Sequence, residues 1–202
     1  MRIYITRHGE TRWNIEGRIQ GHLDSQLTDK GEEGARKLRE RLFEEEIDVI
    51  ISSPLERAHK TARIIKGSRN IDIDLNSKLK EINCGEFQGE RFDEIWEKNP
   101  EAKNKLKKNP IKFIYPKGES LEIFYNRVEE GFNEILEKYD EKDILIVTHG
   151  GTIRSILAEM FEKQNGSTWF KDVVENCSLS IYDYNGENFE EILYNDITHL
   201  EK

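Results

Sequence analysis

Short apolar runs rich in isoleucine and valine alternate along the chain with longer stretches in which apolar residues recur at helical spacing. The short runs predict buried strands, because strands are brief and favour β-branched residues. We place these strands at 2–6, 47–53, 71–75 and 143–148. The longer stretches predict helices that begin after Thr28, after Ser53, near Leu121 and at Gly150.

Two of these helices carry start signals in the sequence. Thr28 can cap a helix that continues through the glutamates at 44–46. The inner face of this helix is expected to consist of Ala35, Leu38, Leu42 and Phe43. Ser53 followed by Pro54 is typical of an N-cap and a first helical position, so the next helix is expected to run from there to Gly67.

The remaining chain contains an irregular region and a closing hairpin. Residues 76–118 hold scattered glycines, prolines and aromatic residues, which predicts a partly helical insertion whose aromatic side chains divide between core and pocket wall. Asn185-Gly186 predicts the turn between two final strands. We therefore expect the α/β class: one domain over residues 1–202, a three-layer α/β/α sandwich with a mostly parallel sheet, an antiparallel edge and the insertion covering the active site.

Composition restricts the partners. The chain has 202 residues, 31 basic against 40 acidic, and a formal net charge of -9. Nucleic acids and anionic membranes attract basic surfaces, so we expect neither as a partner. An acidic protein that concentrates arginines in a few loops is instead expected to hold an anion at those loops.

The cysteines and the apolar runs indicate the compartment. Cys84 and Cys177 are far apart and show no CxxC spacing; one disulfide is conceivable, but two reduced thiols are the better interpretation. The sequence shows no signal segment and no apolar run long enough to span a bilayer. We expect a cytoplasmic protein.

Arginines and histidines follow the predicted parallel strands. Arg7 and His8 come after the first strand. Arg57 lies in the first helical turn after the second, and His149 follows the last. The carboxyl ends of parallel strands meet at one edge, where ligands bind. Guanidinium groups match phosphate oxygens, so we predict a metal-free phosphate site, with Gly9 letting the backbone turn away beneath the phosphate.

The motifs at these positions also resemble a known family. The chain resembles the histidine phosphatase superfamily, the phosphoglycerate-mutase-like proteins whose hallmark is Arg-His-Gly at the end of the first strand. The resemblance spans nearly the whole chain and rests on the following segments, which occur in the family's order: "RHGETRWN", "QGHLDSQLTDKG", "SSPLERAHKTA", "LKEINCGEFQGE", "GES" and "VTHGGTIR".

The resemblance implies a role for each matching residue. His8 would be the nucleophile that forms a phosphohistidine, and Glu81 the proton donor. From the residues alone, Glu86 and Glu90 in the same loop are alternatives, and the resemblance selects Glu81. Arg7, Arg57 and His149 would also be catalytic, surrounding the transferring phosphoryl group. The phosphate and substrate would be bound by Arg7, Asn14, Gln20, Gly21, Arg57 and His149.

The expected function is a metal-independent phosphomonoester hydrolase that uses no cofactor and acts on a small phosphorylated metabolite. An alternative is a cofactor-dependent phosphoglycerate mutase; the insertion lacks the Arg-Arg pair that such mutases carry, which favours the phosphatase. A non-catalytic phosphate-binding relative is a third reading. The substrate choices left open are α-ribazole phosphate, a sugar phosphate or a broad range of esters, and the protein is expected to be a monomer or homodimer.

Overall fold

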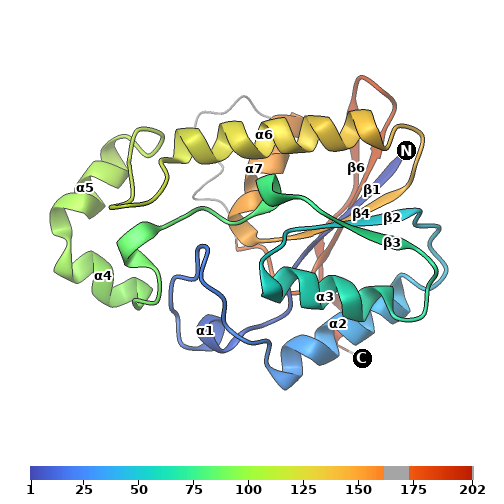
Figure 1. Cartoon of the computed structure of the whole chain (residues 1–202), viewed down its shortest axis with the longest axis horizontal. Helices are drawn as coiled ribbons and strands as arrows, with labels where there is room; N and C mark the ends of the chain where they lie inside the picture. Colours follow the sequence, from blue (N-terminus) through green and yellow to red (C-terminus); the bar gives the residue numbers. More distant parts are fainter. Residues whose placement is uncertain (162–172, 202) are drawn as a thin grey trace.

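A six-stranded sheet forms the centre of the computed structural model, which describes residues 1–161 and 173–201. The strand order is β3-β2-β4-β1-β5-β6 (Figure 1). Neighbours among the first four strands in this order run parallel, whereas β5 and β6 pair antiparallel, with β5 beside β1. The mostly parallel sheet with an antiparallel edge is thereby confirmed. The bounds are β1 Arg2–Arg7, β2 Val49–Ser52, β3 Asp72–Leu75, β4 Ile144–Thr148, β5 Leu179–Tyr184 and β6 Phe189–Asp196.

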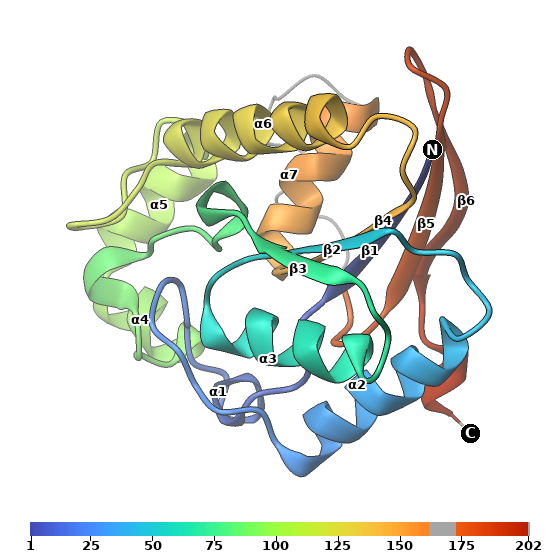
Figure 2. The same cartoon turned by 45° about the vertical axis from the view of Figure 1, so that its right-hand side comes forward.

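Helices cover both faces of this sheet, as Figures 1 and 2 show. Successive strand residues point to opposite faces. In β4, Ile144 and Ile146 belong to the core cluster under α6 and α7, whereas Leu145 and Val147 belong to the cluster under α2 and α3. The three-layer sandwich is thereby confirmed. The covering helices are α2 Asp29–Arg41, α3 Glu56–Lys66, α6 Leu121–Lys138 and α7 Gly150–Phe161.

The insertion lies beyond the carboxyl ends of the parallel strands (Figure 1). It is partly helical, as predicted, with two 3₁₀ turns at Ser77–Leu79 and Gly85–Phe87 followed by α4 Phe92–Lys98 and α5 Pro100–Lys108. Its buried aromatic residues pack edge to face, with ring centroids 5.0 to 5.8 Å apart in three of the pairs. These residues, Phe87, Trp96, Phe113 and Tyr115, extend the core cluster under α6 and α7 into the insertion.

The predicted end of α2 was wrong. The helix stops at Arg41, with Leu42 as its C-cap, instead of continuing through the glutamates at 44–46. Leu42 is still buried, but Phe43 is 77% exposed. Once the chain leaves the helix, the helical period no longer decides which side faces the core, so Phe43 does not join the inner face.

The predicted start of α3 was also wrong. The helix begins at Glu56, and its N-cap Leu55 makes no side-chain hydrogen bond. The Asp24 carboxylate, from another loop, accepts the backbone N–H groups of Glu56 and Arg57 at 2.9 and 3.3 Å. The cap is therefore tertiary. The Ser53 hydroxyl lies ahead of the helix, where it accepts the N–H of Leu55 at 3.3 Å and bonds to His149.

The last two strands form the predicted hairpin, with a longer loop than a two-residue turn. Tyr184 pairs with Phe189, so four residues connect the strands. The Asn185 side chain accepts the N–H groups of Glu187 and Asn188, which stabilises this loop. The positive φ of Gly186 explains the glycine there.

The remaining predictions concern thiols and membrane spans. Cys84 and Cys177 are buried and free, which confirms the two reduced thiols. Among the described residues, no helix combines the length and the apolar character needed to cross a membrane.

Candidate active site

A cavity of about 320 Å³ opens at the carboxyl ends of the central strands, between the sheet and the insertion. Its wall brings together seven of the predicted site residues: Arg7, His8, Asn14, Gln20, Gly21, Arg57 and Glu81. The eighth, His149, is fully buried beside His8, with ring centroids 5.3 Å apart. Residues up to 142 positions apart in the sequence therefore converge at one edge, as strand polarity predicts.

His8 is held as a neutral imidazole with one ring nitrogen available. Its Nδ1 lies 2.8 Å from the Gly9 carbonyl oxygen. A carbonyl oxygen can accept a hydrogen bond but cannot donate one, so Nδ1 carries the proton. Burial lowers the pKa of His8 well below 6.5, and the positive charges of Arg57 and Arg7 lower it further. The lone pair therefore resides on Nε2.

Gly9 has a different role from the predicted turn. A Cβ at this position would lie 2.5 Å from the Gly31 carbonyl oxygen, in the first turn of α2. Gly9 also donates its N–H to the Thr61 hydroxyl at 3.0 Å. Close packing between the His8 loop and α2, and not a turn beneath a phosphate, thus requires glycine here.

Two arginines bring positive charge to the cavity. Arg57 is 2% exposed, and its Nη groups donate to the carbonyls of Gly21 and Leu23 and to Asp24. Arg7 donates from Nη1 to the Val174 carbonyl at 2.6 Å. Burial lowers the pKa of both, but a guanidinium group stays charged in proteins. The Nε atom of each is buried without an acceptor among the described residues.

Asp24 is a site residue that the sequence did not reveal. Its carboxylate pairs with Arg57 Nη1 at 2.9 Å while capping α3, so it fixes both the backbone and the side chain of Arg57. Asp24 lies 33 positions before Arg57, and nothing in the local sequence distinguishes it from an ordinary loop aspartate.

His149 lies beneath this positive site. Its Nε2 is 2.8 Å from the Ser53 hydroxyl oxygen, and its Nδ1 is buried without a partner among the described residues. Burial lowers the pKa of His149 well below 6.5, with Arg57 and His8 adding to the effect. Buried polar atoms normally have partners, so Nδ1 and the two arginine Nε atoms are exceptions near the cavity.

Among the three candidate glutamates, only Glu81 lines the cavity. Its Oε2 accepts the N–H of Gly151 at 3.0 Å, in the first turn of α7, and its Oε1 accepts the N–H of Ile82. Glu86 pairs with Lys117, and Glu90 lies 3.9 Å from Lys98, both at exposed positions. The geometry therefore agrees with the choice made by resemblance.

The amide side chains at 14 and 20 present polar atoms to the same cavity. Asn14 accepts the N–H and the hydroxyl of Thr11 through Oδ1, which leaves its amide hydrogens as donors. Gln20 is 9% exposed, and its Oε1 has no partner among the described residues. Gly21 adopts a positive φ and passes so close to Gln88 that a side chain would collide with it.

Other wall residues were not predicted as site residues. Arg154 lies on α7 four positions after Gly150, so helical spacing could have placed it on the face that begins at the cavity. Arg18 and Phe92 also line the cavity, and Phe92 is 60% exposed there. In the described part of the chain, no three histidine, cysteine, aspartate or glutamate side chains are grouped so that they could hold a metal ion.

The comparison with protein families agrees with this arrangement. Residues 3–197 match the model of the histidine phosphatase superfamily, branch 1. The chain belongs to this superfamily. It is thus an enzyme of the histidine phosphatase type, and the resemblance found in the sequence is confirmed.

Individual relatives of this histidine phosphatase carry different names. It is 34% identical to phosphoglycerate mutase-like protein 4 of Arabidopsis thaliana, over 99% of this chain and 87% of the relative. It is 31% identical to phosphoserine phosphatase 1 of Hydrogenobacter thermophilus, over 90% of this chain and 85% of the relative. The crystal structure of the α-ribazole phosphatase from Shigella flexneri superposes with a TM-score of 0.89 at 28% identity, covering 97% of this chain and 96% of that one.

Proposed function

We propose that this chain is a phosphomonoester hydrolase that works without a metal, through a phosphohistidine on His8. One observation carries the proposal: neutral His8, whose Nδ1 is engaged by the Gly9 carbonyl, lines a cavity together with Arg7 and Arg57, and each arginine keeps a buried Nε donor without an acceptor among the described residues. A dianionic phosphoryl group would accept these donors while its phosphorus faces Nε2 of His8.

In the first step, His8 Nε2 attacks phosphorus, so that an N–P bond forms and the P–O bond to the alcohol breaks. Glu81 in its acid form gives its proton to the departing oxygen, and the alcohol leaves. The arginines and His149 would hold the oxygens of the transferring group, whose negative charge spreads over them in the transition state.

In the second step, Glu81 as carboxylate takes a proton from water, and the water oxygen attacks phosphorus. The N–P bond breaks and its electron pair returns to Nε2. Orthophosphate, neutral His8 and protonated Glu81 are regenerated, so no external reagent besides water is consumed.

The substrate proposed is a small phosphate monoester. Beyond the phosphate end, the wall includes apolar side chains that would contact the alcohol part: Ile19, Ile82, Phe92, Tyr115, Val173 and Val174. The names of the relatives offer three chemistries to test first: phosphoserine, α-ribazole phosphate and phosphoglycerate.

A mutase acting on phosphoglycerate is the second candidate. Arg18 and Arg154 line the cavity in addition to the two arginines near His8, and such cations suit a substrate carboxylate. A mutase would return the phosphoryl group from His8 to a second hydroxyl instead of to water. The two functions therefore share every step up to the phosphohistidine.

Turnover of p-nitrophenyl phosphate in the presence of EDTA separates these readings. We expect release of orthophosphate, a phosphorylated His8 detectable by mass spectrometry after rapid quenching, and loss of both in His8→Ala. Interconversion of 3- and 2-phosphoglycerate stimulated by 2,3-bisphosphoglycerate, and faster than any hydrolysis, would replace the phosphatase by the mutase. Retained activity in a folded His8→Ala variant would overturn both.

A further inference from the structure

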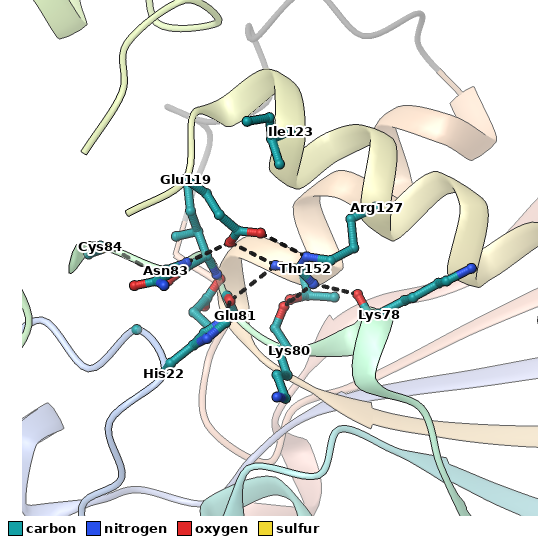
Figure 3. Close-up of polar contacts among 12 residues, drawn as sticks. His22, Lys78, Lys80, Glu81, Asn83, Cys84, Glu119, Ile123, Arg127 and Thr152 are labelled. Atoms are coloured by element: carbon teal, nitrogen blue, oxygen red, sulfur yellow. Dashed lines mark hydrogen bonds and ion pairs between the residues drawn. The ribbon is translucent and has the colours of Figure 1, made fainter. Parts of the chain in front are cut away.

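The segment that carries Glu81 has little regular structure of its own. After the 3₁₀ turn Ser77–Leu79, residues 80–84 form neither helix nor strand, so their backbone carbonyls need other donors. Figure 3 shows that side chains from α6 and α7 converge on this segment. One arginine, Arg127 of α6, donates to the carbonyls of Lys80 and Glu81 within this segment and to that of Lys78 just before it.

Arg127 uses all of its hydrogen-bonding capacity within the protein. Its Nη1 donates to the carbonyls of Lys78 and Lys80 at 2.7 and 3.0 Å. Its Nη2 donates to the Glu81 carbonyl at 3.3 Å and to Glu119 Oε2 at 2.9 Å, and its Nε donates to Glu119 Oε1 at 2.9 Å. A guanidinium group has five N–H donors, so none remains for a substrate.

Glu119 fixes the other end of the same segment. Its carboxylate accepts the N–H of Asn83 at 2.7 Å, and its own N–H donates to the Asn83 carbonyl at 2.8 Å. A Cβ at Gly118 would lie 2.3 Å from that carbonyl, so glycine permits the approach. Ser120 caps α6 by accepting the N–H of Ile123. The "GES" motif therefore joins the Glu81 segment to the start of α6.

The pair is bidentate and largely buried, with 20% and 16% of the two side chains exposed. Arg127 also lies 5.2 Å over the ring of buried Phe124, which limits its motion. Bidentate arginine–carboxylate pairs fix orientation as well as distance. The Glu81 carbonyl is contacted from the other side by His22 Nε2 at 2.9 Å. The backbone on which the Glu81 side chain is mounted is thus held from two directions.

We propose that the Arg127–Glu119 ion pair is the positioning unit for the proton donor Glu81. Neither Arg127 nor Glu119 lines the cavity. The pair instead binds three carbonyls and one N–H of the backbone around Glu81, and this backbone sets the direction of the Glu81 side chain. The proposal rests on the proposed function, because it needs Glu81 to protonate the leaving alcohol.

Proton donation leaves a measurable signature. Without it, the departing oxygen must leave with its negative charge, and the rate then depends steeply on how basic that oxygen is. Phosphates of phenol, p-chlorophenol and p-nitrophenol differ little in shape but much in leaving-group basicity. Their kcat/KM values report the steps up to formation of the phosphohistidine, so they isolate the first proton transfer.

The experiment compares these esters in the wild type, Glu81→Gln, Arg127→Lys and Glu119→Gln. We expect Glu81→Gln to lose about a hundredfold in kcat/KM on phenyl phosphate and much less on p-nitrophenyl phosphate. Arg127→Lys and Glu119→Gln should show the same pattern, with roughly a tenfold loss on phenyl phosphate. An equal loss on all three esters would overturn the proposal, since a merely structural defect lowers every rate alike.

Matched controls remove the effect of losing an ion pair in general. Glu122→Gln breaks the exposed pair with Lys112, at the start of the same helix. Arg36→Lys alters exposed pairs with Glu32 and Glu33 on α2. Both controls should keep the wild-type dependence on leaving-group basicity. If either one shifts it as far as Arg127→Lys does, the pair has no special role.

A double variant separates this inference from the proposed function. In a Glu81→Gln background, Arg127→Lys should cost less than twofold on phenyl phosphate, because residues that act through one group are not additive. A full tenfold additional loss would overturn the positioning role. If Glu81→Gln itself leaves the pattern unchanged, the assignment of the proton donor fails instead, and loss of activity in His8→Ala still tests the hydrolase reading independently.

Discussion

Single protons decide what the two buried histidines can do. The Gly9 carbonyl fixes the proton of His8 on Nδ1, and the Ser53 hydroxyl engages Nε2 of His149. Both rings are buried beside cationic Arg57, so each remains neutral where an exposed histidine would begin to protonate. Among the described residues, a backbone carbonyl and not a carboxylate is the hydrogen-bond partner of His8 Nδ1.

These neutral histidines make folding stability depend on pH. The pKa of His8 is lowered in the folded state, so below the ordinary value of 6.5 the unfolded chain binds the proton more readily. The contribution of His8 to the free energy of unfolding is therefore fully present above pH 6.5. It decreases as the pH falls towards the folded pKa, by about 1.4 kcal/mol per pH unit. The unfolding free energy of His8→Asn and of the wild type can be measured with urea across this pH range. The slope of the variant against pH should be smaller than that of the wild type by the contribution of this one histidine.

A parallel pH dependence in the two proteins would contradict the buried neutral state of His8. His149→Asn offers a second measurement, because burial likewise lowers its pKa well below 6.5. His59, for comparison, is partly exposed on α3 and gives a control variant, His59→Asn.

At the scale of elements, the loop after β1 is packed against the start of α2. Gly9 and Gly31 approach each other so closely that a Cβ on either would collide with backbone: Gly31 with the Glu10 carbonyl oxygen at 2.1 Å, and Gly9 with the Gly31 carbonyl oxygen at 2.5 Å. The loop that carries His8 is therefore positioned by α2 as well as by β1.

Two glycines on α2 allow a matched test of this contact. Gly31→Ala should lower the unfolding free energy by about 1–3 kcal/mol and reduce kcat/KM, because the backbone next to His8 must shift. Gly34 lies on the same helix, and a Cβ there would be 3.4 Å from Cys177 Sγ, which is an ordinary contact distance. Alanine also has a better helix propensity than glycine at this position. Thermal unfolding and p-nitrophenyl phosphate assays on both variants should separate them; equal behaviour would contradict the close contact.

Elements were predictable from the sequence where local pattern and burial agree. The strands ending at Arg7 and Thr148, and the helix starting at Gly150, followed from apolar runs and their polar ends. Strand polarity predicted that His8 and His149 lie at the same edge of the sheet, and the structure places their rings side by side. The end of α2 was not predictable, because Phe43 continues the apolar pattern beyond the last helical residue.

Contacts between segments that are distant in the sequence could not be predicted either. Asp24 caps α3 from another loop, and His149 bonds to the Ser53 hydroxyl. In both cases the spacing of residues in the sequence does not reveal the partner. The same holds for Arg127, which in the sequence is one basic residue on an amphipathic helix. Motif resemblance located Glu81, whereas the side chains that hold its backbone required the structure.

At the scale of the whole molecule, a positive cavity is set in an acidic protein. The formal net charge is -9, yet four arginines and one glutamate line the cavity: Arg7, Arg18, Arg57, Arg154 and Glu81. The proposed phosphate site lies in this cavity, and a ligand that binds only the folded chain stabilises it.

Orthophosphate should therefore raise the melting temperature through this cavity. At a concentration one hundred times its dissociation constant, specific binding adds about 2.7 kcal/mol to the unfolding free energy. Orthophosphate also stabilises proteins in general through exclusion from their surface, so the comparison needs variants. Arg57→Met should lose the saturable part of the shift, while Arg36→Met, at an exposed position, should keep it. A saturable shift that survives Arg57→Met would place the phosphate elsewhere.

The insertion and the sheet edge contribute different parts of the cavity. His8, Arg7 and Arg57 come from the ends of strands and the helix that follows, whereas Ile82, Cys84, Phe92 and Tyr115 come from residues 76–118. The insertion also supplies Glu81, whereas its Phe92 and Tyr115 contribute side chains of the cavity wall that have no part in the proposed steps. Under the proposed function, a preference for another alcohol can thus arise from substitutions at such wall positions of one contiguous stretch, while Glu81, His8 and the arginines stay unchanged.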